Sequence, residues 1–352
     1  MSQIRRVKLA AIQAIKTIGG FERLANSRWR QKRLLILCYH GISLEDEHLW
    51  RPTLYVSADM LENRLRAIKA MECSVLPLGE ALNLLRTGDL PPRSVVITFD
   101  DGTYDFYKQA WPRLQRYNFP ATVYQTTYYS DREMPIFNLI CSYMLWKRRE
   151  TPLEPVREFG IHEPRDLSTE EGRIQVVTGL VALSERDRLS GQQKNELARR
   201  LADALGIDFS SLSSKRVLHL MNAREVAEVG RVSVDVQLHG HRHRTPRDEM
   251  SFRQEIRENR ERIQALTGRD ANHFCYPSGA YRQEFVGWLQ KEHVVSATTC
   301  DPGLVQINDE LFRLPRFLDT SLRTQVEFDS WLSGAAALMA MRRSVSPRYI
   351  RE

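Results

Sequence analysis

The chain of 352 residues has few cysteines and no long hydrophobic run. Its five cysteines are scattered and form no CxxC pair, so we expect neither a disulfide framework nor a thiolate zinc site. Free thiols of this kind are typical of a reducing compartment. No stretch of about 18 apolar residues occurs, and the start lacks the apolar core and cleavage site of a signal peptide. These absences predict that the protein has no transmembrane helix and that it works in the cytoplasm.

The chain also lacks blocks of like charge. Its 51 basic and 44 acidic residues give a modest net charge of +7, and a hydrophobic content of 42% is ordinary for a globular protein. Because no Lys/Arg block alternates with aromatic residues, a nucleic-acid partner is not expected. The positive balance is compatible with an anionic partner, such as a membrane surface or an acidic glycan.

One apolar run ends in two adjacent carboxylates. Residues 94–99 are mostly apolar or β-branched and lead directly into Asp100, Asp101 and Gly102. A short, continuously apolar run is typical of a buried strand. Neighbouring carboxylates at its end repel each other and lose solvation, unless a metal ion or separate roles as base and ligand remove the conflict. Taken alone, the pattern fits a solvated turn equally well.

Three histidines follow another strand-like run. Residues 232–238 lead into His239, His241 and His243, which alternate with Gly240 and an arginine. All three would share one face of an extended segment, whereas His239 and His243 alone would pair if the segment coils. Imidazole is the commonest zinc ligand, and two histidines with one carboxylate leave a position open for water. The pattern favours a metal site, and a basic surface loop is the alternative.

Strand and helix signals alternate over most of the chain, which predicts a parallel sheet or barrel. The expected strands are residues 34–39, 74–76, 94–99, 121–124, 232–238, 273–276, 295–299 and 311–317. The expected helices are residues 57–71, 78–85, 105–117, 250–267 and 281–291. Between about residues 135 and 225 charged helical sequence replaces the strand signals, which predicts a helical insertion that shapes substrate access or forms a packing surface.

The two ends of the chain differ from this pattern. Residues 1–30 carry apolar side chains at helical spacing with basic residues around them, which predicts an amphipathic helix. Such a helix can lie on an anionic membrane, or it can pack on the domain behind it. Residues 335–352 are rich in arginine and weakly patterned, so we expect a C-terminal tail. Residues 31–334 would form the main domain.

The two motifs together resemble those of a known family. Residues 98–102 resemble the first motif of the polysaccharide deacetylases (the NodB-homology domain, carbohydrate esterase family 4). Residues 239–243 resemble the HxxxH second motif, with Gly240 where Ser or Thr is usual. Residues 39–42 and 120–122 look like the family's opening strand and the strand after the Asp pair. The resemblance, over roughly residues 34–130 and 230–320, implies a deformed (β/α) barrel with a helical insertion.

The resemblance implies one divalent metal ion, most often zinc, held by Asp101, His239 and His243, with Asp100 as general base. The residue types suit this chemistry, because a Lewis acid polarises an amide carbonyl and activates water while an unbound carboxylate takes the proton. The implied activity is removal of N-acetyl groups from a polysaccharide or a lipid-linked sugar. The alternatives are a catalytically impaired carbohydrate-binding protein on this scaffold and a hydrolase of a non-sugar amide.

The third motif of the family, typically Arg-x-Pro-Tyr, is degenerate here. Cys275 stands in the place of the arginine that orients the base, and Arg316 is our candidate to replace it. The backbone N–H of Ser278 can still stabilise an oxyanion, since that role needs no particular side chain. Tyr276 and Pro277 of the same motif are expected to border the substrate.

The catalytic acid cannot be assigned from the sequence. The family's Leu-x-x-His motif is absent, and no histidine follows His293. His40 ends the first apolar strand, so it either reaches the site or is a hydrogen-bonded core residue. Without a signal peptide, and with a basic amphipathic start, we expect action at the inner face of a bacterial membrane during exopolysaccharide assembly.

Overall fold

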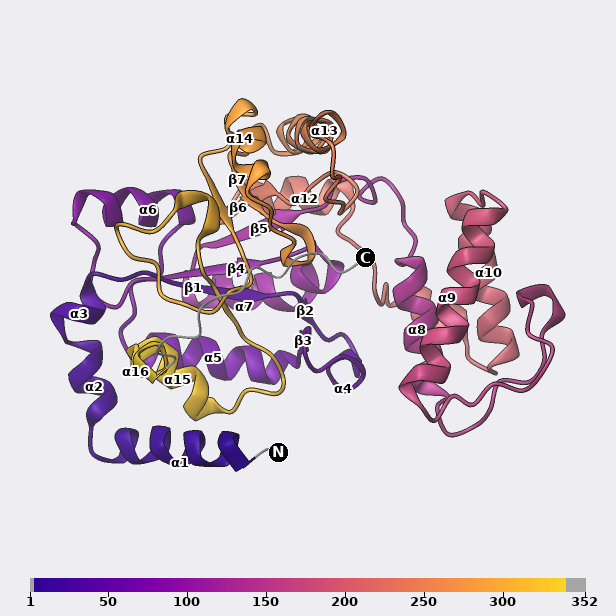
Figure 1. The fold of residues 1–352 in the computed structure, drawn as a ribbon, viewed down its shortest axis with the longest axis horizontal. Helices are drawn as coiled ribbons and strands as arrows, with labels where there is room; N and C mark the ends of the chain where they lie inside the picture. The colour runs from indigo at the N-terminus through magenta and orange to yellow at the C-terminus, as the bar shows by residue number, and fades with distance from the viewer. Residues whose placement is uncertain (1–2, 340–352) are drawn as a thin grey trace.

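The computed structural model describes residues 3–339 of the chain, arranged around a curled parallel sheet of seven strands (Figure 1). The order of the strands in the sheet is β8-β7-β6-β5-β4-β1-β9. They are β1 (Leu35–Tyr39), β4 (Val95–Phe99), β5 (Ala121–Gln125), β6 (Val234–Leu238), β7 (His273–Cys275), β8 (Ser296–Thr298) and β9 (Phe317–Leu318). A separate parallel pair joins β2 (Gly41–Ile42) to β3 (Tyr55–Val56). The sheet is a half-barrel, as the alternating sequence pattern predicts.

The register of the strands brings the chemically important residues to one edge. Tyr39 of β1 is aligned with Phe99 of β4, so the residues that follow, His40 and Asp100, emerge side by side. Leu238 of β6 is aligned with Gln125 of β5, and His239 follows at the same edge. Because the strands are parallel, all of their carboxyl ends meet there.

Helices cover the sheet because its strands are apolar on both faces. One face of β1 and β4 joins the main hydrophobic core, and alternate residues such as Ile36 and Val96 join a second cluster. The helices around the sheet are α5 (Ala58–Ala70), α6 (Leu78–Thr87), α7 (Trp111–Tyr117), α12 (Ala223–Gly230), α13 (Glu249–Thr267), α14 (Glu284–Lys291) and α15 (Gln325–Ser333). A π-helical segment, Phe106–Ala110, precedes α7 and lies next to the Asp pair in sequence.

The predicted insertion is a group of helices to one side of the sheet (Figure 1). It contains α8 (Phe137–Lys147), α9 (Glu170–Arg186), α10 (Gly191–Ala204) and α11 (Phe209–Ser214). These helices bury their apolar faces in a hydrophobic cluster of their own, which includes Met144, Leu180 and Leu201. Between them and β1 lies the short helix α4 (Glu47–Trp50), which contacts α8. The next helix, α12, already packs against β6 and α13 and therefore belongs to the half-barrel.

The N-terminal segment forms three helices instead of the single predicted helix. They are α1 (Gln3–Thr17), α2 (Gly20–Ala25) and α3 (Arg28–Gln31). Gly19 adopts a left-handed conformation (φ 70°) that separates α1 from α2. Helix α1 packs on α15, where Ile12 is buried and Lys16 Nζ lies 2.7 Å from Asp329 Oδ2. Within residues 3–339, no helix is long and apolar enough to cross a membrane.

Two smaller expectations, for residues 74–76 and 311–317, were wrong. The predicted strand at 74–76 is a single bridge between Val75 and Val95. The segment 311–317 contains a 3-10 turn (Leu311–Arg313), and its strand begins only at Phe317. The predicted C-terminal tail begins with a packed helix, α16 (Ala335–Met339). Residues 340–352 of that tail lie outside the described residues.

Candidate metal centre and active site

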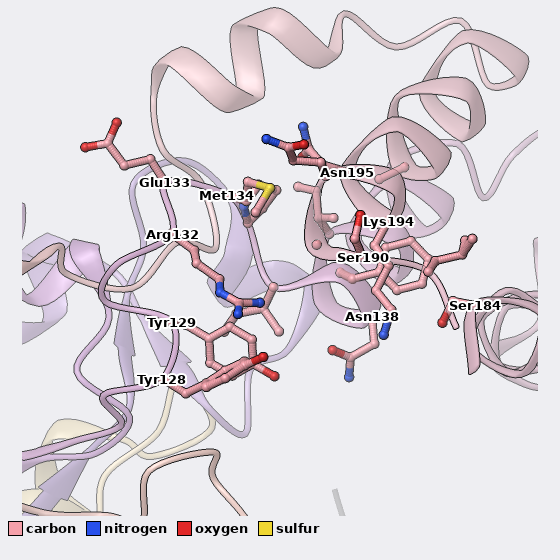
Figure 2. A pocket seen from close by; sticks show the side chains of 18 of the residues that line it. Tyr128, Tyr129, Arg132, Glu133, Met134, Asn138, Ser184, Ser190, Lys194 and Asn195 are labelled. Atoms are coloured by element: carbon pink, nitrogen blue, oxygen red, sulfur yellow. The ribbon is translucent and has the colours of Figure 1, made fainter. Parts of the chain in front are cut away.

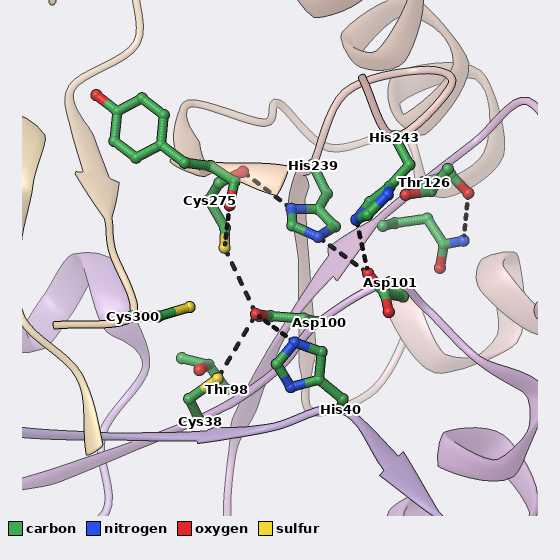
Figure 3. Close-up of polar contacts among 12 residues, drawn as sticks. Cys38, His40, Thr98, Asp100, Asp101, Thr126, His239, His243, Cys275 and Cys300 are labelled. Atoms are coloured by element: carbon green, nitrogen blue, oxygen red, sulfur yellow. Dashed lines mark hydrogen bonds and ion pairs between the residues drawn. The ribbon is translucent and has the colours of Figure 1, made fainter. Parts of the chain in front are cut away.

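One carboxylate and two imidazoles converge at the carboxyl edge of the sheet (Figure 3). Asp101 Oδ1 lies 3.1 Å from His239 Nε2 and 3.2 Å from His243 Nε2. The three ligand atoms lie within 4.8 Å of one another, a separation suited to one shared ion. Asp101 follows β4 and both histidines follow β6, strands that flank β5 in the sheet.

The protonation of His239 fits a metal ligand. Its Nδ1 lies 2.9 Å from the Cys275 carbonyl oxygen, which can only accept, so Nδ1 carries the proton. In the neutral ring Nε2 is then a bare lone pair that faces another acceptor, Asp101 Oδ1, at 3.1 Å. Two acceptors this close need a cation between them, either a proton or a metal ion. A carbonyl that fixes the other nitrogen is the usual support of a metal-binding histidine.

The electrostatic surroundings favour an ionised Asp101 carboxylate and a protonated His239 imidazole. Burial alone would raise the pKa of Asp101, but its hydrogen bonds to His239 and His243 hold the pKa well below the ordinary value. Burial would lower the pKa of His239, and the Asp101 carboxylate outweighs that effect and raises it. Carboxylate and imidazole therefore attract the same positive charge, which in a metal-loaded protein would come from the ion.

The backbone at the site adopts conformations that side chains other than glycine rarely take. Asp101 has a φ of 69° and His243 a φ of 55°, both in the left-handed region. Gly102 and Gly240, with φ of 74° and 76°, form the same turns without that penalty. The turns after β4 and β6 direct Asp101 and His243 toward each other. Local backbone strain therefore accompanies the approach of these potential metal ligands.

Asp100 is held in a buried ion pair with Arg316. The carboxylate is 2% exposed, and both of its oxygens accept hydrogen bonds from the guanidinium, at 2.7 and 2.8 Å. Arg316 is itself fixed by the Thr299 carbonyl oxygen at 2.9 Å. Burial raises the pKa of Asp100, but the charge of Arg316 outweighs burial and lowers it below the ordinary value. Asp100 is therefore ionised and fixed in orientation.

Two thiols and one imidazole complete the surroundings of Asp100 (Figure 3). The thiols of Cys38 and Cys275 lie 3.5 and 3.6 Å from Asp100 Oδ2. Burial raises the pKa of both thiols, so they are neutral neighbours and not nucleophiles. His40 Nε2 lies 3.7 Å from the same oxygen, and its side chain is partly exposed. His40 therefore reaches the site and is not a core residue.

Tyr276 and Pro277 of the degenerate third motif do not border the site, contrary to our expectation. Tyr276 is 1% exposed and donates its hydroxyl to the Phe312 carbonyl oxygen, and Pro277 is also buried. Neither side chain presents a surface to a substrate, because both are buried. Ser278 is exposed in the turn that follows, with a φ of 57°, and it remains a candidate backbone donor.

The third histidine of the run does not join the metal group. His241 Nδ1 lies 2.9 Å from Thr127 Oγ1, and its ring contacts Tyr128. Burial lowers the pKa of His241, which favours a neutral ring. The segment coils, so His239 and His243 pair and His241 points elsewhere, which is one of the two arrangements that the sequence allowed.

Two buried polar residues of α13 support the site and were missed in the sequence. Asn259 Oδ1 accepts the His239 backbone N–H at 2.9 Å, and Glu255 accepts the Arg242 backbone N–H at 2.6 Å. They lie four residues apart on the buried face of α13. Polar residues at apolar positions of an amphipathic helix are the signal that would have identified them.

Known sequences match parts of the chain. The family model described as polysaccharide deacetylase matches residues 87–156 and 213–294. A poly-beta-1,6-N-acetyl-D-glucosamine N-deacetylase of Staphylococcus aureus is 37% identical over 67 residues, which cover 19% of this chain and 23% of that protein. The corresponding protein of Staphylococcus epidermidis is 30% identical over 99 residues, or 28% and 34% of the two chains. The chain thus matches about a quarter to a third of the length of these relatives.

Solved structures match over a larger part of the chain. A Streptococcus pyogenes deacetylase in complex with acetate superposes with a TM-score of 0.54 and 17% identity, covering 82% of this chain and 93% of that one. A de-N-acetylase from Aggregatibacter actinomycetemcomitans gives a TM-score of 0.53 and 15% identity over 85% and 99%. At these identities the likeness shows the fold alone, and the fold is the half-barrel expected from the sequence motifs.

Proposed function

Because the chain resembles the polysaccharide deacetylase family in motifs, sequence and fold, we propose that it is a metal-dependent hydrolase of N-acetyl groups on a polysaccharide. The observation that carries the proposal is the pairing of two neighbouring carboxylates in different roles. Asp101 faces His239 and His243, whereas Asp100 is turned to Arg316. The relatives named for deacetylation of poly-beta-1,6-N-acetyl-D-glucosamine support a sugar amide as substrate.

Asp101, His239 and His243 would hold the divalent ion, and one carboxylate with two imidazoles is a ligand set found in catalytic zinc sites. When bound there, the ion supplies a Lewis acid for the acetyl carbonyl and activates water at neutral pH. Asp100 takes the proton of that water. Its ion pair with Arg316 keeps Asp100 ionised and fixes the direction of its free lone pairs.

His40 and Ser278 complete the proposed machinery. His40 Nε2 lies 3.7 Å from Asp100 Oδ2, and its partly exposed ring can give a proton to the leaving amine. This assigns to His40 the role of the acid that the sequence motifs lack. The backbone N–H of Ser278 would donate to the oxyanion that forms on the carbonyl oxygen.

The test combines metal analysis with acetate release from N-acetylglucosamine oligomers. We expect stoichiometric metal in wild type and in Asp100→Asn, with acetate release reduced about 10²- to 10⁴-fold in the latter. His243→Ala should lose both metal and activity, and zinc should restore wild type after chelation. His162→Ala, in an exposed part of the insertion, is the matched control.

Two results would overturn the proposal. Metal-loaded protein whose acetate release does not depend on Asp100 would remove the proposed base. Absence of bound metal, with His243→Ala indistinguishable from wild type, would remove the metal centre. The same assay on a lipid-linked N-acetyl sugar decides between a polymer and a lipid-linked substrate.

A further inference from the structure

A pocket of about 850 Å³ lies between the half-barrel and the helical insertion. One side is the loop after β5, and the other is formed by α8, α9 and α10 (Figure 2). Figure 2 shows Tyr128, Tyr129 and Arg132 across the pocket from Ser184 and Lys194. We call it the insertion pocket and define it by Tyr129, Arg132, Asn138, Ser190, Lys194 and Asn195.

We propose that the insertion pocket binds sugar units next to the one that is deacetylated, so that the substrate is a glycan chain of several residues. The inference rests on the proposed function and deepens it by specifying the substrate's size. The volume of the insertion pocket falls within the roughly 300–1,000 Å³ that is usual for ligand pockets in proteins. The residues that define it belong to neither the metal group nor the surroundings of Asp100.

The insertion pocket and the active site share a wall. The Tyr128 backbone N–H donates to the His241 carbonyl oxygen at 2.8 Å, which fastens the pocket's loop to the histidine run. Arg244, the residue after His243, itself lines the pocket. The pocket therefore borders the segment that carries the histidines, and we infer that neighbouring units of a chain bound at His243 extend toward it.

Polar side chains on both sides of the pocket show what kind of ligand fits. Arg132 lies on the side of the β5 loop, and Asn138, Lys194 and Asn195 lie on the side of the helices. Such groups favour a ligand that carries hydroxyl and amide groups. Sugar hydroxyls and the acetamido group of an N-acetylated sugar offer both donors and acceptors.

The rest of the lining is also suited to sugar rings. Asn138, Lys194 and Arg132 offer polar groups, while Tyr129 and Met134 offer apolar surface for the carbon–hydrogen faces of a pyranose. An alkyl chain would use the apolar surface but would leave the polar groups of Asn138, Lys194 and Arg132 without a ligand partner. The lining therefore favours a glycan over the tail of a lipid.

The experiment measures how affinity depends on chain length, independently of turnover. Metal-loaded Asp100→Asn protein is titrated calorimetrically with N-acetylglucosamine dimers and hexamers. We expect the hexamer to bind at least about tenfold more tightly, and Asn195→Leu combined with Lys194→Met to reduce that ratio to about twofold. Dimer affinity should not change, because a dimer can occupy the active site without the pocket.

Asn308→Leu, the same substitution at an exposed loop residue outside the pocket, is the matched control and should keep the full length dependence. Thermal unfolding checks that each variant is folded. Lys194→Met alone serves as a second variant, because Lys194 is only partly buried and its loss leaves no cavity in the core.

The inference is overturned if wild type shows no length dependence, or if the pocket variants keep it. It is also overturned if the pocket variants weaken binding of a lipid-linked monosaccharide but not of the hexamer. Failure of the proposed function gives a different result. In that case wild type releases no acetate from any oligomer, whereas length-dependent binding and its loss in the variants are still measurable.

Discussion

At the scale of single residues, the carboxylate of Asp100 is held by an arginine from a distant part of the chain. Arg316 lies 216 residues later and approaches from the segment before β9. The place of the family's usual arginine is taken by Cys275, whose thiol lies 3.1 Å from the Arg316 guanidinium. A guanidinium therefore holds Asp100, although the motif position at which the resemblance places an arginine carries a cysteine.

We predict that Arg316→Met destabilises the protein by about 3–5 kcal/mol, because it leaves Asp100 as an unpaired buried charge. Acetate release should fall about a hundredfold as the base loses its orientation. Adding Cys275→Arg should recover part of both losses, since the new guanidinium would start from within reach of the same carboxylate. Urea unfolding and acetate assays of the single and double variants measure this.

Arg282→Met is the control, because Arg282 pairs with Glu284 at the surface and its loss should change stability by less than about 0.5 kcal/mol. If Arg316→Met kept wild-type stability and activity, the ion pair would have no role in positioning Asp100. A double variant no better than Arg316→Met would mean that the geometry of Arg316 cannot be reproduced from β7.

The sequence predicted those site residues that are close neighbours in the chain. The pairs Asp100–Asp101 and His239–His243 stand out because two residues able to act as metal ligand or base follow the same strand. Arg316 was only a candidate, since nothing local separates it from other arginines nearby. Tyr276 was misplaced because a motif position does not reveal whether a side chain packs inward. Contacts between residues hundreds of positions apart follow from the packing of the whole sheet.

At the scale of elements, continuous apolar runs predicted β1 and β4, because strands buried on both faces need such runs. The strands β5 and β6 contain polar residues, and they were predicted from the alternation of strand and helix signals. The shortest strands were harder to predict from the sequence. β9 has two residues, and its pairing with β1 depends on a partner far away in the chain. The helices of the insertion were predicted, but their placement was not, because the pocket that they form with the β5 loop depends on packing between distant segments.

The turn after β4 leads to a matched prediction for Gly102 and Gly240. Both glycines have φ near 75°, so alanine at either costs about 1–2 kcal/mol of backbone strain. A Cβ at Gly102 would overlap the Gln125 side-chain amide, whereas at Gly240 the nearest atom is 3.5 Å away. We expect Gly102→Ala to cost about 1–3 kcal/mol more than Gly240→Ala and to lower metal affinity.

Thermal unfolding and zinc titration of the two variants test this difference, and Gly240→Ala is the control for backbone strain. Equal losses of stability in both variants would show that backbone strain alone accounts for the effect of alanine. A Gly102→Ala protein with unchanged zinc affinity would show that the turn does not position Asp101.

At the scale of the whole molecule, the N-terminal helices pack on the domain with some side chains and expose other, apolar side chains to solvent. Arg30 is fully buried and donates to the carbonyl oxygens of Leu332 and Ser94, so deletion of residues 1–30 would damage the fold. Yet Val7 and Ile18 are 66% and 69% exposed on the same segment. Apolar side chains among basic ones suit an anionic membrane surface, and surface substitutions can test this without disturbing the core.

We propose that this segment brings the protein to an anionic membrane, and we predict that Arg6→Gln, Arg23→Gln and Arg28→Gln together weaken binding to phosphatidylserine vesicles. All three side chains are exposed, and each lost charge should cost up to about 1 kcal/mol, more at low salt. Vesicle sedimentation measures the change. Arg165→Gln, Arg188→Gln and Arg269→Gln remove the same charge from exposed sites elsewhere and should have little effect. Equal losses in both triple variants would indicate attraction by net charge alone, and no binding by wild type would reject the membrane contact.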